Sequence, residues 1–166
     1  MKKLFFIAAF TAVSFAVQAQ NETKKPLKFS IGLEAALPLG NFADVSSFGI
    51  GGSAQADYSI AEKLAITLNA GYISFSGKTF SGIKLPAVGF IPVLAGIKYD
   101  LTPQLYGSAQ LGVTFSDQSG GGSIFTYAPG LGYKFTENFD ALLKYTGYSD
   151  KGGTLNTVGL RIAYTF

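Results

Sequence analysis

Seven charged residues occupy positions where they could perform acid–base chemistry or neutralise one another. They are Glu34, Asp57, Lys98, Lys134, Asp140, Lys144 and Arg161. Carboxylates can serve as general acids or bases and lysine as a nucleophile, whereas opposite charges that are buried together form ion pairs. All seven fall within runs of alternating apolar and polar residues, on the polar side of each run. The spacing therefore predicts that they share one enclosed environment.

Two residue types that often carry catalysis or bind metals are missing, and no loop concentrates the groups that Ser/Lys or carboxylate chemistry would need. The chain of 166 residues contains no His and no Cys, so the usual imidazole base and the preferred zinc ligands are not available. The acidic residues are scattered and form no Asp-rich calcium loop. We predict no catalytic, cofactor-binding or metal-binding residues, no cofactor and no enzymatic activity. The seven charged residues are then best explained as a polar network.

β-Strands must position this network, because period-two alternation dominates the chain after Lys25. Eight segments of about ten residues each place apolar residues on one face, as tilted membrane strands do. These segments lie at 28–37, 48–60, 64–72, 91–99, 105–115, 125–135, 139–146 and 158–166. No apolar run approaches the roughly 18 residues of a membrane-spanning helix. The length fits a single domain.

The connections between these segments alternate in length. Those at 61–63, 100–104 and 136–138 are short, and the other four are longer and rich in Gly and Ser. Since successive antiparallel strands reverse direction, all short turns share one end with both termini. This asymmetry is typical of bacterial outer-membrane barrels. We predict an all-β fold, an eight-stranded antiparallel up-and-down transmembrane β-barrel.

Aromatic residues on the apolar face form two groups that flank an aliphatic middle, which is the pattern of interfacial girdles. The group near the short turns is Tyr58, Tyr99, Tyr133, Phe135, Phe139, Tyr164 and Phe166, and the group near the long loops is Tyr72, Phe115, Phe125, Tyr127 and Tyr145. An Arg or Lys facing lipid at mid-membrane costs about 2–4 kcal/mol, and no strand carries a charge on this face. We therefore expect lipid outside and the charged network in the lumen.

Two alternatives remain open at this stage. A lumen lined by Lys98, Lys134, Lys144 and Arg161 could form a narrow channel for small anionic solutes. A soluble, periplasmic, lipocalin-like barrel would invert the two faces and enclose an apolar ligand site.

Cross-strand spacing gives more specific expectations. Lys134 should lie near Asp140 across their turn, Lys98 opposite Tyr106, and Glu34 of the first strand beside Arg161 of the last. Pro92 lacks the N–H that a ladder hydrogen bond needs, so we expect a bulge there.

The first nineteen residues are typical of a secretory signal peptide. Lys2 and Lys3 precede an apolar run, and Val17 and Ala19 occupy the −3 and −1 positions of a cleavage site. Residues 20–27 would form a short polar lead and 28–166 the barrel. The formal net charge of +3 includes the two leader lysines, so we expect no nucleic-acid partner.

Three stretches resemble the small outer-membrane β-barrel family of the OmpA transmembrane-domain and OmpX type, also called porin family: FIPVLAGIKYDL (90–101), GLGYKF (130–135) and GLRIAYTF (159–166). The resemblance implies the outer membrane of a Gram-negative cell, contact with outer-membrane lipids, a monomer, and a structural or surface-interaction role. It also implies that Tyr164 and Phe166 form an assembly signal for the barrel-assembly machinery. Lys78, Phe80 and Lys84 mark a candidate surface loop whose ligand is unknown.

Overall fold

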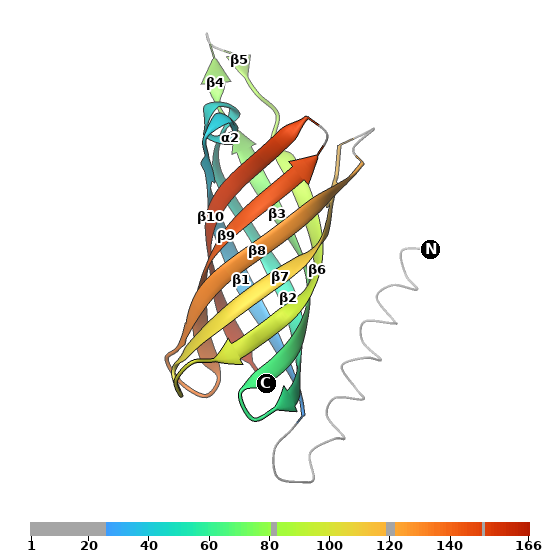
Figure 1. The fold of residues 1–166 in the computed structure, drawn as a ribbon. Coiled ribbons are helices and arrows are strands. Elements are labelled where there is room, and N and C mark those ends of the chain that lie inside the picture. Colours follow the sequence, from blue (N-terminus) through green and yellow to red (C-terminus); the bar gives the residue numbers. More distant parts are fainter. Residues whose placement is uncertain (1–25, 81–82, 119–121, 151) are drawn as a thin grey trace, which may run out of the picture.

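The computed structural model describes residues 26–80, 83–118, 122–150 and 152–166. Eight long antiparallel strands form a closed barrel in the order β1-β10-β9-β8-β7-β6-β3-β2 (Figure 1). The strands are β1 (Leu27–Leu39), β2 (Ser46–Ala61), β3 (Leu64–Gly77), β6 (Val88–Asp100), β7 (Leu105–Ser116), β8 (Ser123–Lys134), β9 (Phe139–Asp150) and β10 (Gly153–Thr165). This architecture confirms the predicted fold class. The predicted signal peptide lies outside the described residues.

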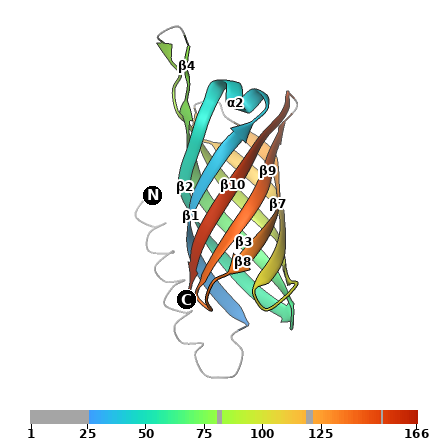
Figure 2. The same cartoon turned by 90° about the vertical axis from the view of Figure 1, so that its left-hand side faces the viewer.

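The two ends of the barrel differ as the loop lengths predict. One end, called the turn end below, carries the short turns and the C-terminus (Figures 1 and 2). The other, called the loop end, carries the short helix α2 (Asn41–Val45) and a hairpin of β4 (Thr79–Phe80) and β5 (Ile83–Lys84). The hairpin projects beyond the barrel rim (Figure 2). Among the described residues, no helix has the length and apolar character needed to span a membrane.

The last two strands extend further at the loop end than the alternation predicts. β9 runs to Asp150 and β10 begins at Gly153, and Tyr148 pairs with Leu155 inside the added segment. Tyr148 is buried and Leu155 half-buried on the inward side of their strands, which the sequence pattern predicts to be the polar side. A large apolar residue on the inward side breaks the alternation of apolar and polar residues. The sequence pattern therefore ends the first of these two strands, and begins the second, short of the loop end.

The expected bulge at Pro92 is wrong. The register between β3 and β6 is the same on both sides of Pro92, and Pro92 pairs with Thr114 of β7 without a shift. The proline only leaves a gap of two residue pairs in the β3–β6 ladder, because it lacks the donor for one hydrogen bond. The register shifts of this sheet region lie at the two ends of β2 instead.

The outer surface is apolar over the length of the strands. Large apolar side chains alternate outward on every long strand, with Leu33 the most exposed at 74%. Aromatic rings contact one another in both girdles. The ring centroids of Phe139 and Tyr164 lie 5.0 Å apart at the turn end, and those of Tyr127 and Tyr145 lie 6.3 Å apart toward the loop end. A lipocalin-like barrel would need a polar exterior, which these faces do not provide.

Candidate functional site

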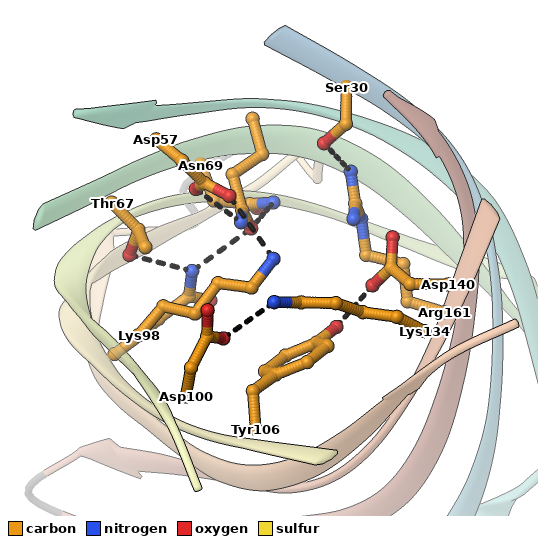
Figure 3. A network of polar contacts seen from close by, with 12 residues as sticks. Ser30, Asp57, Thr67, Asn69, Lys98, Asp100, Tyr106, Lys134, Asp140 and Arg161 are labelled. Carbon is orange, nitrogen blue, oxygen red and sulfur yellow. Dashed lines mark hydrogen bonds and ion pairs between the residues drawn. The ribbon is translucent and has the colours of Figure 1, made fainter. Parts of the chain in front are cut away.

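The lumen consists of a polar layer toward the turn end and an apolar layer at the loop end. Figure 3 shows the polar layer, in which side chains from most of the strands meet inside the barrel. All seven charged residues predicted for the lumen have buried or half-buried side chains there. Their partners decide what this layer can do.

Glu34 forms the centre of the innermost polar group. Its carboxylate binds Lys144 Nζ at 2.9 Å and lies 3.7 Å from Arg161 Nε. Ser53 Oγ donates to Glu34 Oε1 at 2.8 Å and accepts from Arg161 Nε at 2.8 Å. Arg161 is only 2% exposed, and its second nitrogen donates to Ser30 Oγ at 3.0 Å. Two cations therefore share one buried carboxylate, and the hydroxyl groups of Ser30 and Ser53 accept hydrogen bonds from the guanidinium.

A glycine makes the room for this arginine. A Cβ on Gly32 would lie 2.8 Å from Arg161 Nε, which is closer than real Cβ contacts come. Glu34 and Arg161 are also direct partners across the β1–β10 ladder, as the sequence predicts. The guanidinium therefore lies against the strand that closes the barrel.

A second polar group joins β2, β3, β6 and β7. Lys98 Nζ binds Asp57 Oδ2 at 3.3 Å, and Gln55 Nε2 donates to the other oxygen of Asp57 at 2.7 Å. The side-chain oxygen of Gln55 accepts from Asn69 at 3.3 Å and from Gln110 at 3.1 Å. These amides fill the cross-section of the barrel with hydrogen-bonded side chains.

A third group lies around Tyr106 near the turn end. The ring has Lys98 Nζ 4.1 Å and Lys134 Nζ 5.9 Å from its centroid, within the range of a cation–π contact. Its hydroxyl donates to the buried carboxylate of Asp140. Lys134 Nζ forms an ion pair with Asp100 at 2.7 Å. Acids and cations are thus interleaved around one aromatic ring (Figure 3).

Two of the expected contacts differ in the structure. Lys134 and Asp140 are ladder partners, as expected, but the ammonium of Lys134 binds Asp100 instead. Lys98 pairs with Ser108 across the ladder and not with Tyr106, although its ammonium lies over the Tyr106 ring. Long side chains reach across the lumen, so ladder position alone does not choose their partners.

Sequence reasoning missed one charged member of the polar layer. Asp100 was expected in a turn, yet it is the last residue of β6 and shares the inward parity of Lys98. Tyr106, Gln55 and Gln110 also occupy inward positions. The alternation of the sequence places these three on the polar side of their strands, and the same parity would have found Asp100, which lies two residues beyond Lys98.

The loop-end layer is an aromatic cluster that closes the lumen. Phe42 of α2 is 4% exposed and lies 5.0 Å from Phe75 between ring centroids. Phe75 lies 5.6 Å from Phe90, which lies 5.0 Å from Tyr148. We call these four rings, with Ala36 and Ile73, the aromatic plug. The helix in the first long loop, and its insertion into the lumen, were not predicted.

A vestibule of about 690 Å³ opens at the turn end. The short turns form its rim, and Lys98, Asp100, Lys134 and Asp140 lie at its base. Within the described ranges, no group of three His, Cys, Asp or Glu residues could hold a metal ion.

The predicted assembly and loop residues lie at opposite ends of the barrel. Tyr164 and Phe166 are exposed on the outer surface, and the Phe166 N–H donates to the Phe29 carbonyl at 2.9 Å. Lys78 is exposed at the base of the hairpin, and its N–H donates to the Val45 carbonyl at 2.9 Å. The predicted Phe80 and Lys84 belong to β4 and β5, and their side chains lie outside the described part of the chain.

Solved structures with this fold come from several bacteria. Ail, the attachment invasion locus protein of Yersinia pestis, has a TM-score of 0.63 at 16% identity, over 86% of this chain and 100% of Ail. The N-terminal β-barrel domain of Pseudomonas aeruginosa OprF has a TM-score of 0.59 at 19% identity, over 84% of this chain and 97% of that domain. Neisserial surface protein A has a TM-score of 0.54 at 15% identity, over 87% of this chain and 100% of its own. At these identities the likeness concerns the fold.

No curated protein sequence gives a significant match. Residues 5–166, however, match the family described as outer membrane protein beta-barrel domain. This match covers the whole barrel. The chain therefore belongs to the outer membrane protein β-barrel domain family.

Proposed function

We propose that this chain is a non-enzymatic integral outer-membrane protein with a structural or surface-interaction role and a filled, non-conducting lumen. The observation that carries the proposal is that each of the four cations predicted to line a pore has a carboxylate partner. Lys98 pairs with Asp57, Lys134 with Asp100, and both Lys144 and Arg161 with Glu34. Paired charges offer an anion little attraction, and the aromatic plug obstructs the loop end.

Conductance in planar bilayers tests the filled lumen. We expect no steady channels from the folded wild-type barrel and none from Lys144→Ala or Arg161→Ala at equal protein density. Steady anion-selective conductance in the wild type, reduced by Lys144→Ala, would instead establish the narrow channel. Heat-dependent gel mobility verifies that each variant is a folded barrel.

The surface role is assigned to the hairpin of residues 79–84 with Lys78 at its base. The strand β4 projects beyond the rim (Figure 2), and hydrogen bonds fix the base of the hairpin: the Lys78 N–H donates to the Val45 carbonyl, and the Leu85 N–H donates to the Lys78 carbonyl at 2.9 Å. A fixed projecting hairpin can present side chains to a partner without disturbing the barrel. The partner's chemistry is not encoded in the few charges nearby.

Replacing residues 79–84 by a short Gly-Ser turn tests this role. We expect unchanged barrel folding, and loss of whichever surface phenotype deletion of the gene produces, among adhesion, permeability and stress tolerance. Ail is named for attachment and has been solved with a heparin analogue, so a sulfated polysaccharide is a reasonable first probe. The variant with the shortened hairpin is expressed in the deletion strain. If it restores the lost phenotype fully, the hairpin has no part in the surface role.

Export and insertion complete the proposed function. We infer that residues 1–19 are a signal peptide, that 20–27 form a lead, and that the assembly machinery recognises Tyr164 and Phe166. The mature protein is proposed to be a monomer with lipid around its apolar face and no nucleic-acid partner. The mass of the mature protein tests cleavage after Ala19, and carbonate washing of membranes tests integration, since a peripheral protein would be released.

A further inference from the structure

We propose that the outer wall formed by β6 to β10 holds one hydrocarbon chain of a membrane lipid in a defined groove. The groove has a volume of about 560 Å³ and is open along its length to the membrane side. We call it the lipid-side groove. Gly107, Ala109 and Pro129 form its floor, and Tyr99, Leu131 and Tyr145 are among its walls. The inference rests on the membrane placement proposed above and goes beyond it.

The floor is low because three small residues are neighbours on the outward face. Ala109 pairs with Pro129 across the β7–β8 ladder, and Gly107 lies two positions before Ala109 in β7, on the same face. A Cβ built on Gly107 would meet no atom within 4 Å. The protein therefore leaves the space above this glycine unfilled.

The walls are tall side chains from the neighbouring strands. Tyr99 pairs with Gly107, and Leu131 pairs with both Gly107 and Leu143. Tyr99 belongs to the turn-end girdle and Tyr145 to the loop-end girdle, so the groove crosses the aliphatic band between them. Four spacings between β6 and β10 give a length of about 19 Å, and the apolar band of such barrels is about 25 Å tall. A long, narrow, apolar space of this length suits an extended acyl chain.

The lining excludes a polar partner. Among the charged residues that the structure describes, only Lys144 borders the groove, and its ammonium binds Glu34 inside the barrel. The groove thus offers a partner apolar contact and no ion pair. Between apolar surfaces in a membrane, association depends on close packing, since lipid tails are as apolar as the side chains. A second barrel would present a convex wall of large side chains, which would touch the walls of the groove before its floor.

Fluorescence quenching in detergent micelles tests the groove. The chain contains no Cys, so a single cysteine can carry a fluorophore without background. Leu111→Cys places the label two residues from the floor on β7, and Ile50→Cys places it on β2, on the opposite side of the barrel. Both native side chains are 60% exposed. Phosphatidylcholine with brominated acyl chains is then titrated into micelles that contain either labelled barrel.

We expect saturable quenching at Leu111→Cys at a lipid content several-fold lower than at Ile50→Cys. Gly107→Leu fills the floor without a clash and should abolish this difference. Gly52→Leu is the matched control: it is an outward glycine of β2 outside the groove, and its Cβ would make only an ordinary 3.5 Å contact. It should leave the quenching unchanged. Heat-dependent gel mobility shows that each variant is folded.

Equal quenching at both labels, or persistence of the difference in Gly107→Leu, would overturn the proposal. A wild-type dimer that Gly107→Leu converts to a monomer in sedimentation would overturn it as well, and would assign the groove to a second copy of the chain. These measurements use barrels already folded in micelles. Their failure therefore leaves the membrane placement intact, which carbonate washing tests separately.

Discussion

Replacing Glu34 by glutamine should destabilise the barrel strongly while keeping the shape of the side chain. Glu34 is 6% exposed and is the shared carboxylate of Lys144 and Arg161. Glu34→Gln leaves two enclosed cations without a counter-charge. The loss of stability comes from leaving these buried charges without a counter-charge, and not from the lost attraction of the ion pair itself.

The structure sets the size of this effect. Removing one partner of a buried ion pair costs about 3–5 kcal/mol. Arg161 keeps its hydrogen bonds to Ser30 and Ser53, and the Lys144 side chain is 14% exposed, so both cations retain some stabilisation. We therefore expect a loss of unfolding free energy at the lower end of this range, about 3 kcal/mol. Such a loss lowers the folding equilibrium constant roughly a hundredfold.

Equilibrium unfolding in urea measures this loss, with the barrel refolded in lipid vesicles and followed by circular dichroism and gel mobility. Glu137→Gln is the matched control, because Glu137 is exposed in a turn, and it should change stability by no more than about 0.5 kcal/mol. Glu34→Leu combined with Lys144→Met and Arg161→Met removes all three charges and should recover most of the loss. A loss below about 1 kcal/mol in Glu34→Gln would refute the reasoning.

Three further outcomes follow from the lumen and the C-terminus. Phe42→Ala should cost about 3 kcal/mol, at the lower end for a buried phenylalanine, and urea unfolding should detect it; a change below about 0.5 kcal/mol would mean that α2 does not depend on the plug. Gly132→Ala should destabilise the barrel, because its Cβ would fall 2.0 Å from the Tyr106 ring, and in a Tyr106→Ala background the same substitution should cost much less; an equal loss of stability in both backgrounds would contradict this cause. Deletion of Phe166 should slow insertion in cells more than it lowers the stability of the inserted barrel, as measured by pulse-chase protease protection and by urea unfolding; insertion at the wild-type rate would count against the assembly signal.

The sequence was sufficient for the architecture because lipid imposes a strict rule on each strand. Alternation with charges on one side identifies membrane strands, and unequal loops set their direction. The rule weakens outside the apolar band, where Tyr148 and Leu155 point inward. There the interior is apolar too, so the contrast between the two faces disappears and the strand ends could not be located.

The sequence could predict which side of its strand each charged residue of the candidate site occupies. It could not predict which residue each of them pairs with. Parity placed Glu34 beside Arg161, since these residues are neighbours across one ladder. It could not reveal that Lys134 reaches Asp100 from another strand, because that contact depends on side-chain length across the lumen. Phe42 lies in a loop without periodicity, so no pattern indicated that it enters the barrel.

The aromatic plug has a consequence for the order of assembly. Ala36, Phe75, Phe90 and Tyr148 come from β1, β3, β6 and β9, strands that surround a common space only after the sheet has closed. Phe42 contacts Phe75 and Phe90 on the neighbouring strands β3 and β6, but Tyr148 of β9 completes the cluster around it only at that moment, so full burial of the Phe42 ring requires a closed barrel. Burial of this one ring thus distinguishes a finished barrel from an open sheet, and resistance of the first loop to proteolysis would time the final step of biogenesis.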